Sequence, residues 1–302
     1  MDGVIPLVSV IIPVRNDQQK IHKCLVSLLK MDYPPDRREI LVVDDDSTDQ
    51  TAEIINRFPV QYLRQERPGS AAARNRGIEA SRSEVLAFTD ADCVVSTGGL
   101  RELVQGFENE KVGAVAGEVV AYPPKTPAER YIAVLKPLWQ IPVINSRDSQ
   151  WFDLTCAAFR REVFDKIGLF DPRFVAGEGT DFCRRFFQDK RFELRYRPKA
   201  VVFHRHRASA RELFGQYHSY GYGQALLCRK YRREHLWDWH RELAAHKDLL
   251  LTALAFGRAA IRSRLRGWDT PECSYLYFEL IRKLGARIGF IRGTVRRDAG
   301  RG

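Results

Sequence analysis

The chain has 302 residues, of which 44% are apolar and 29% are charged, and this is the composition of a globular protein with room for one large or two small domains. Its net charge of +11 lies in the last third, because residues 1–200 contain 29 basic and 29 acidic side chains whereas residues 201–302 contain 20 and 9. The N-terminus lacks the pattern of a signal peptide, and no apolar run reaches the roughly 20 residues of a membrane span. We therefore expect a cytoplasmic protein with a neutral body and a basic tail that faces an anionic partner.

The cysteine pattern agrees with this compartment. No CxxC pair occurs among the six cysteines, which stand at positions 24, 93, 156, 183, 228 and 273. Scattered thiols of this kind are more typical of a reduced cytosolic protein than of a disulfide framework or a zinc site.

The first two hundred residues alternate apolar runs with helical patterns, as in an α/β sheet with crossover helices. The first run, VSVIIPV, has the unbroken apolar character of a buried strand. Strands are predicted at residues 8–14, 40–43, 60–64 and 84–89, and helices at 17–30, from the Ser47-Thr48-Asp49 cap to about 57, and at 71–81.

The pattern becomes less regular after residue 100, and from residue 210 onward it is nearly all helical. We predict strands at 112–122, 151–160 and 195–202, and helices at 128–144 with an interruption at Pro137, at 161–167, and from about 178.

Two predicted strands end in clustered acids. Asp44, Asp45 and Asp46 follow one strand, and Asp90 and Asp92 follow another. Ligands of open α/β sheets bind outside the carboxyl ends of the strands, so both acidic ends belong at one edge. Two carboxylates spaced by one residue could share a hard divalent cation, although a solvated turn accounts for the spacing equally well. The three adjacent acids could also begin a helix, where the dipole favours negative charge.

A glycine turn leads into a helix of small residues over PGSAAARNRG, residues 68–77. The start of such a helix is compatible with anion binding, and its small side chains would allow close approach of a nucleotide. A packed helix with solvated arginines at 74 and 76 is the alternative reading.

These segments together resemble family 2 glycosyltransferases of the GT-A fold over about residues 6–225. The matching text is VSVIIPVRND (8–17), EILVVDDDSTDQT (39–51), RPGSAAARNRGI (67–78), EVLAFTDADCVV (84–95), FDPRF (170–174) and GEGTDFCRR (177–185). The combination is specific, although each piece alone is not. The resemblance implies a nucleotide-sugar donor and Mg²⁺ or Mn²⁺ as cofactor, because a metal lowers the cost of charge on the diphosphate leaving group.

The resemblance also implies roles for individual residues. Asp92 would ligate the metal directly, and Asp90 would reach the metal or the ribose. Positions implied to contact the nucleotide are Pro13, Arg15, Asp45, which would bond the base, and Arg74.

Two downstream features extend the likeness. His204 and His206 alternate at strand spacing, and His204 could approach the metal, although a structural or surface histidine accounts for it as well. Gln216 and Tyr220 match positions that family members place near the acceptor.

The stretch VAGEGTDFCRRF departs from the family pattern. Inverting members carry a Glu-Asp pair whose Asp takes the acceptor's proton; here Glu178 matches the Glu, but Gly179 stands at the base position. Loss of a positioned base costs about 10²–10⁴ in rate. Glu178 could have replaced it, the protein could be a weakened relative, or Gly179 could be an isolated change. Asp181 is either a second catalytic acid or a helix-capping group.

The last predicted helix is basic and amphipathic. Its apolar stripe comprises Tyr277, Leu280, Ile281, Leu284, Ile288, Ile291 and Val295, and its basic residues are Arg282, Lys283, Arg287, Arg292, Arg296 and Arg297. Such a helix suits an anionic membrane surface, and packing of the stripe onto the domain is the equally weighted alternative. No nucleic-acid motif accompanies the charge, so nucleic acid is not an expected partner.

Together these features predict a GT-A domain over residues 1–225, divided into a nucleotide half (1–95) and an acceptor half (96–225), and a basic helical extension over 226–302. The expected activity is metal-dependent, inverting transfer of a sugar, from a UDP-sugar, to a saccharide or lipid-linked hydroxyl in cell-envelope or extracellular polysaccharide synthesis. Localisation would be cytoplasmic, with peripheral attachment to the inner face of the membrane. The alternatives are a catalytically weakened nucleotide-sugar-binding or scaffold protein, and a nucleotidyltransferase, which would need a glycine-rich phosphate loop after the first strand.

Overall fold

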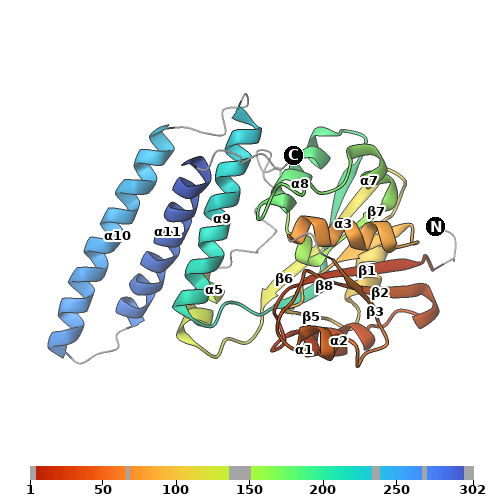
Figure 1. Ribbon diagram of the computed structural model, residues 1–302, viewed down its shortest axis with the longest axis horizontal. Helices are drawn as coiled ribbons and strands as arrows, with labels where there is room; N and C mark the ends of the chain where they lie inside the picture. Colours follow the sequence, from red (N-terminus) through yellow and green to blue (C-terminus); the bar gives the residue numbers. More distant parts are fainter. Residues whose placement is uncertain (1–4, 66–68, 136–150, 233–238, 267–270, 296–302) are drawn as a thin grey trace. The chain divides into compact units, whose positions relative to one another are not determined.

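The computed structural model describes residues 5–65, 69–135, 151–232, 239–266 and 271–295 (Figure 1). The chain divides into two compact units, residues 1–123 with 136–205, and residues 124–135 with 206–302. This division differs from the predicted boundary at residue 225, which falls inside helix α9 (Ala210–Lys230). The helix stays in one unit because it packs along helix α11 (Pro271–Val295) of the same unit.

The first unit is built on an eight-stranded mixed sheet with the strand order β3-β2-β1-β4-β7-β6-β8-β5. β1, β2, β3 and β4 run parallel, and β7 pairs antiparallel with both β4 and β6. The strands are β1 (Val8–Val14), β2 (Arg38–Asp44), β3 (Gln61–Arg64), β4 (Val85–Phe88), β5 (Cys93–Val95), β6 (Val112–Ala121), β7 (Ala157–Arg160) and β8 (Glu193–His204).

Helices cover both faces of this sheet, and Figure 1 shows α1 and α2 on one side and α3, α7 and α8 on the other. The alternation of side chains along β1 explains the two layers. Val10 and Ile12 pack with α1, whereas Ile11 packs with α3 and the phenylalanines of α7 and α8. The helices of the unit are α1 (Ile21–Leu29), α2 (Thr51–Ile55), α3 (Ser70–Ala80), α4 (Gly99–Gln105), α7 (Arg161–Ile167) and α8 (Glu178–Gln188), with 3₁₀ turns at Pro35–Arg37 and Leu154–Cys156.

The predicted α/β organisation is confirmed, and the differences are local. The predicted strand over 151–160 is a strand only from Ala157. Before it, the Asp153 side chain accepts a hydrogen bond from the Thr155 amide and closes a 3₁₀ turn, which removes those residues from the ladder. The sequence did not predict β5 or α4. The helix predicted over 128–144 is present as α5 up to Leu135, and the rest of the predicted range lies outside the described residues.

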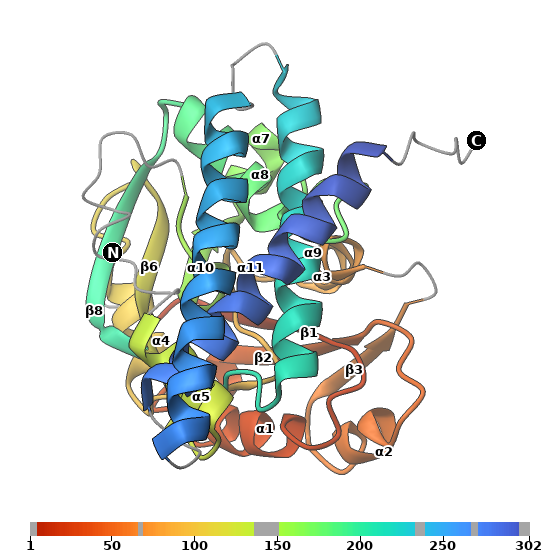
Figure 2. The same ribbon diagram turned by 90° about the vertical axis from the view of Figure 1, so that its left-hand side faces the viewer.

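The second unit is helical and comprises α5 (Pro127–Leu135), α9 (Ala210–Lys230), α10 (Trp239–Arg266) and α11 (Pro271–Val295). Figure 2 shows the last three helices side by side, with α11 in contact with both others. Ion pairs join α10 to α11: Lys283 Nζ lies 2.7 Å from an Asp248 carboxylate oxygen, and Arg287 pairs with Glu242.

Helix α11 approaches α9 most closely at three glycines, while Ile281 of the predicted apolar stripe packs against the cluster that contains Leu213 of α9. Gly285, Gly289 and Gly293 are buried and spaced by four residues, so they share one face. A Cβ built on Gly289 would stand 1.9 Å from the His218 carbonyl oxygen, and one on Gly285 would stand 2.7 Å from that of Phe214. The two backbones therefore approach more closely than any side chain at these positions would allow.

The stripe itself is divided between interior and solvent. Its members Ile288, Ile291 and Val295 are exposed, as are Leu243, Leu250, Leu251, Leu254 and Ile261 of α10. Of the helices in the described ranges, none combines the length and the apolar character needed to cross a membrane.

Candidate functional site

The parallel strands β1, β2 and β4 bring the predicted site residues to one edge of the sheet. Hydrogen bonds tie the loops that follow β1 and β2. The Asn16 amide donates to Ser47 Oγ at 2.9 Å, and the Thr48 amide donates to Asn16 Oδ1 at 2.8 Å. The two loops thus form one continuous rim beside Pro13, the penultimate residue of β1.

Asp45, the predicted base-binding residue, is buried at the end of β2. Its Oδ1 accepts hydrogen bonds from Gln65 Nε2 at 2.6 Å and from the Gly69 amide at 2.9 Å. The exposed Arg15 guanidinium lies 3.9 Å from Oδ2. Asp45 therefore holds the turn before α3 through both of its oxygens, since Oδ2 also accepts from the Gly69 amide at 3.0 Å.

Arg74 is the centre of a cluster of polar side chains that also contains Ser70, Asp90 and Glu178. It extends from α3, where the small neighbours Ala71, Ala73 and Gly77 let the helix lie close to the sheet. Its two terminal nitrogens bind different acids, with NH1 2.6 Å from Glu178 Oε1 and NH2 2.9 Å from Asp90 Oδ1. Ser70 Oγ also donates to Glu178 Oε1 at 2.6 Å.

The charges of this cluster compensate one another. Burial of Arg74 opposes its charge, but the carboxylates of Asp90 and Glu178 outweigh that effect and raise the pKa of the guanidinium. Removing one partner of a buried ion pair costs about 3–5 kcal/mol, because the remaining charge is left without compensation. Arg74 therefore joins α3, the end of β4 and the start of α8 electrostatically.

Both oxygens of Asp90 are engaged, since Oδ2 accepts from Thr155 Oγ1 at 2.9 Å. In this arrangement Asp90 supports the site, and its contact with a metal or ribose stays a prediction. The sequence interpretation also missed Asp153, which is buried beside this cluster. Burial raises the pKa of Asp153, and the charge of Asp90 adds to the rise. The sequence feature that could have indicated a buried Asp153 is the position of this acid inside the apolar run WFDLTCAAF.

Asp92 and His204 come together as predicted. Asp92 Oδ1 lies 3.3 Å from His204 Nε2, and Asp92 Oδ2 lies 3.9 Å from Lys20 Nζ. Both residues are buried. A carboxylate and an imidazole so placed can hold a divalent cation such as Mn²⁺ or Mg²⁺, and this donor pair suits Mn²⁺ better because Mg²⁺ prefers oxygen ligands alone.

Gly179 lies in the first turn of α8, and its Cα faces Leu154. A Cβ at position 179 would stand 3.1 Å from Leu154 Cδ1 and 3.4 Å from Leu154 Cγ. A larger residue here requires Leu154 to shift by a few tenths of an ångström. The leucine thus borders the position that the resemblance predicts for the family's base.

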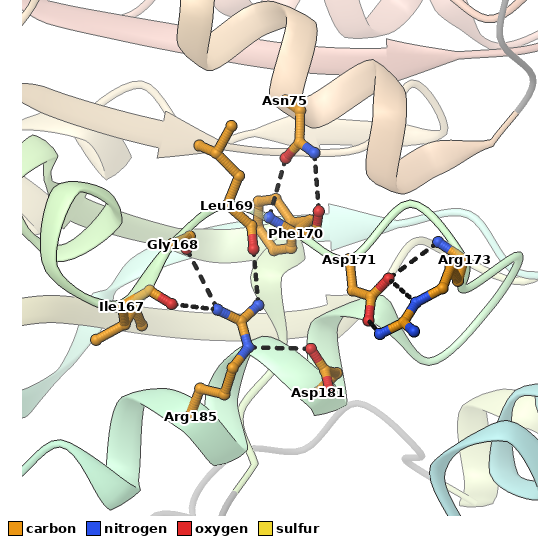
Figure 3. Close-up of polar contacts among 9 residues, drawn as sticks. All are labelled: Asn75, Ile167, Gly168, Leu169, Phe170, Asp171, Arg173, Asp181 and Arg185. Carbon is orange, nitrogen blue, oxygen red and sulfur yellow. Dashed lines mark hydrogen bonds and ion pairs between the residues drawn. The ribbon is translucent and has the colours of Figure 1, made fainter. Parts of the chain in front are cut away.

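Asp181 has surroundings that favour a structural role over acceptor contact. Its carboxylate is fully buried and accepts from Arg185 Nε at 3.1 Å (Figure 3). Arg185 in turn donates to the Ile167 and Leu169 carbonyls at 2.6 and 2.8 Å. Asp181 is not the N-cap of α8, which is Gly177, but it is an acid of the first turn, as the structural alternative held, and its carboxylate orients the arginine that binds carbonyls at and just beyond the end of α7.

Two further segments have local partners. Asn75 exchanges two hydrogen bonds with the Phe170 backbone, which fixes the FDPRF segment to α3 (Figure 3). Gln216 and Tyr220, the predicted acceptor-side residues, lie one turn apart on α9 of the second unit, and Gln216 Nε2 donates to Tyr220 Oη at 3.2 Å.

The chain matches the sequence profile described as Glycosyl transferase family 2 over residues 9–168, more than half of its length. The chain belongs to this family. The predicted family membership and GT-A fold are therefore confirmed, and the ends of β1, β2 and β4 lie within the matched residues.

Curated relatives of this family 2 chain are glycosyltransferases by name. It is 34% identical to "Glycosyltransferase AglE" of Haloferax volcanii over 61% of the chain and 62% of that protein. It is 32% identical to "Probable glycosyltransferase YdaM" of Bacillus subtilis over 66% of the chain and 50% of that protein. The chain thus spans about half to three fifths of the length of these relatives.

Among solved structures, the family 2 chain is similar to the mannosyltransferase PcManGT of Pyrobaculum calidifontis in complex with GDP-Man and Mn²⁺. The match has a TM-score of 0.62 and 20% identity and covers 96% of this chain and 88% of that one. It also resembles TarS of S. aureus, with a TM-score of 0.52 and 19% identity, over 71% of this chain and 39% of that one. These likenesses support the fold.

Proposed function

We propose that this chain transfers a sugar from a nucleotide-sugar, a UDP-sugar by preference, to a hydroxyl acceptor with inversion at the anomeric carbon. The observation that carries the proposal is the placement of Arg74 between Glu178 and Asp90, next to the pair Asp92–His204. At one edge of the sheet, Arg74 would orient the neighbouring groups, Glu178 would supply a carboxylate on the acceptor side, and Asp92 with His204 would bind a metal.

In the proposed reaction the acceptor oxygen forms a bond to the anomeric carbon while the bond to the nucleotide diphosphate breaks. A divalent cation held by Asp92 and His204 would stabilise the charge that develops on the diphosphate. Glu178 accepts the acceptor's proton: the contacts from Ser70 and Arg74 both end on its Oε1, so Oε2 is the oxygen assigned to the proton. Arg74 orients this carboxylate.

A second candidate function is binding of a nucleotide-sugar with little or no transfer. Two observations favour it. Gly179 has no side chain to act as a base, and Glu178 is already held in an ion pair, with its Oε1 2.6 Å from the Arg74 guanidinium. A scaffold or regulatory protein of this kind would retain the nucleotide edge of the site.

A donor screen separates the two candidates. UDP- and GDP-sugars are tested with Mg²⁺, with Mn²⁺ and with chelator, and binding is measured apart from sugar release. Metal-dependent turnover of one donor supports transfer, whereas binding of a donor without turnover on any acceptor supports the second candidate. Asp92→Asn should weaken metal-dependent binding, and Asp36→Asn, at an exposed position, serves as the matched control.

We propose that the second unit attaches the enzyme to an anionic membrane, where a lipid-linked acceptor for envelope polysaccharide would lie. This is supported by the exposed residues Leu250, Leu254 and Ile261 on α10, with Arg258 and Arg262 between and beside them. Apolar side chains flanked by arginines suit the interface of an anionic bilayer.

The attachment is tested with the full chain by vesicle sedimentation. Leu250→Ser, Leu254→Ser and Ile261→Ser combined should abolish binding to anionic vesicles, while Val134→Ser, an exposed apolar residue of α5, should not. Equal partitioning of the triple variant and the unaltered chain would exclude this surface.

A further inference from the structure

We propose that a cavity beneath the carboxyl end of β4 binds a structural water molecule through the hydroxyl of Thr89. The cavity has a volume of about 30 Å³ and lies within the first unit. Its walls include Val10 of β1, Ala87 of β4, Leu28 of α1 and Leu100 of α4, so it lies between the sheet and these two helices.

The Thr89 hydroxyl is the polar group that points to a ligand. Thr89 is only 3% exposed, and its Oγ1 is buried without a hydrogen bond to any residue that the structure describes. The Thr89 amide, by contrast, donates to the Ile11 carbonyl at 3.4 Å. A hydroxyl that is buried without a partner has lost its hydrogen bonds to solvent and destabilises the folded state. A small polar molecule in the cavity would restore those bonds.

The register of the sheet explains why this hydroxyl faces the cavity. Phe88 stands opposite Ala157 in the antiparallel pair of β4 and β7, so the next pair along the same register is Thr89 and Cys156. Successive residues of a strand point to opposite faces. Phe88 packs in the core that contains α3, whereas Ala87 and Cys156 pack in the core that contains α1 and α4. Thr89 points to the same side as Ala87, and both line the cavity.

The size of the cavity selects water. A bound water needs a cavity of at least about 10–15 Å³, whereas a cavity that binds benzene measures about 150 Å³. The cavity at Thr89, with its volume of about 30 Å³, lies above the first value and far below the second. It therefore accommodates a water molecule and excludes an organic ligand.

Two further residues of the wall offer polar partners, which a bound water needs. The Cys156 thiol donates to the Ala200 carbonyl at 3.5 Å, and its sulfur can accept a weak hydrogen bond. The Val201 carbonyl oxygen lies 3.5 Å from the point where a Cβ of Gly99 would stand, and both residues line the cavity. A carbonyl oxygen has two lone pairs and can accept a second hydrogen bond. We assign the water as acceptor from Thr89 and as donor to these two groups.

The water would lie directly behind a hydrogen bond of the candidate site. Thr89 precedes Asp90, Cys156 follows Thr155, and Thr155 Oγ1 donates to Asp90 Oδ2 at 2.9 Å. A water bound to Thr89 and Cys156 would link the end of β4 to the turn that carries Thr155, and would thereby help to position Asp90. This consequence rests on the proposed function, but water binding itself does not.

A high-resolution crystal structure of the full chain tests the proposal without donor, acceptor or any variant. We expect electron density for a water about 2.5–3.0 Å from Thr89 Oγ1, inside the wall formed by Val10 and Leu28. A well-ordered Thr89 with no density in the cavity would overturn the proposal. The same result follows if Thr89 Oγ1 bonds a protein group instead, because the hydroxyl would then need no water.

Thermal unfolding of variants gives an independent measurement. Thr89→Val replaces the hydroxyl with a methyl group of similar size, and loss of the water's hydrogen bond should lower the Tm by about 2–4 °C. Thr89→Ser retains the hydroxyl and should retain the water density. Thr51→Val is the reference, because Thr51 is also buried and its hydroxyl has a partner, Asp49 Oδ1, at 2.5 Å. An unchanged or higher Tm for Thr89→Val, beside a lowered Tm for Thr51→Val, would show that Thr89 binds no water.

Discussion

Leu154 packs against Gly179, with its Cδ1 3.1 Å from the point where a Cβ of residue 179 would stand. Restoring an aspartate at this position therefore requires room as well as a carboxylate. Leu154→Val removes the Cδ1 atom at a cost of about 1 kcal/mol in stability.

If transfer is limited by a missing base, Gly179→Asp combined with Leu154→Val should raise turnover by about 10²-fold or more, and Gly179→Asp alone should raise it less. Turnover is measured at saturating donor and acceptor. Gly179→Ala with Leu154→Val adds the Cβ without the carboxylate and controls for packing. A loss of turnover in both aspartate variants would instead indicate that Glu178 already serves as the base.

Asp181 should contribute to stability rather than to the chemical step. Asp181→Asn removes the charge that orients Arg185, and we expect the free energy of unfolding to fall by about 1.5–3 kcal/mol. Asp165→Asn, at an exposed position of α7, should change it by less than about 0.5 kcal/mol. Denaturant unfolding and steady-state kinetics are compared. A large fall in kcat with unchanged stability would return Asp181 to the catalytic machinery.

Glu279 should make the second unit sensitive to acid. Burial alone would raise the pKa of Glu279, but hydrogen bonds from Arg282 and Tyr131 outweigh it and lower the pKa to about 2. An unfolded glutamate has a pKa of about 4.3, so the unfolded state binds more protons in acid. The stabilisation is complete above about pH 5 and is lost as the pH falls through 2.

The measurement is the Tm difference between the unaltered chain and Glu279→Gln at pH 7 and at pH 3. The difference should shrink at pH 3, because part of the stabilisation of the ionised carboxylate has then been lost. Glu272→Gln, at an exposed ion pair with Arg262, should show little difference at either pH. A difference that does not depend on pH would contradict the role assigned to this carboxylate.

The glycine face of α11 gives a prediction with an internal control. Gly289→Ala would place a Cβ 1.9 Å from the His218 carbonyl oxygen, and forcing the helices apart should cost about 1–3 kcal/mol or more. Gly257→Ala on α10 meets no atom within 4 Å, so it should stabilise by about 1 kcal/mol through helix propensity. Thermal unfolding compares the two, and equal effects would argue against backbone contact between α9 and α11.

The strands and the acidic strand ends could be predicted because their signals are local. An unbroken apolar run marks β1, and the acids after β2 and β4 follow directly in the chain. The three-residue strand β5 carries too short a signal, although it brings Cys93 to His204. The bond from Arg74 to Glu178 joins residues 104 positions apart, and nothing local in the sequence specifies it.

The packing of the last helix could not be predicted from the sequence for a different reason. Its apolar stripe is visible in the sequence and predicted either membrane contact or packing, yet its packing face is the repeat GARIGFIRG. Glycines contribute no apolar side chain to a periodicity search. Their importance appears only when the backbone of a second helix, α9, lies against them.

The position of Arg74 has one more consequence. A single guanidinium is the counter-ion of Asp90, which precedes the metal-binding pair in the chain, and of Glu178, which is assigned to the acceptor. A ligand that draws Asp90 away leaves Arg74 entirely to Glu178, and a ligand that draws Glu178 away leaves Arg74 to Asp90. Ligand contacts at the two carboxylates are therefore thermodynamically linked, and by reciprocity each alters the affinity of the other.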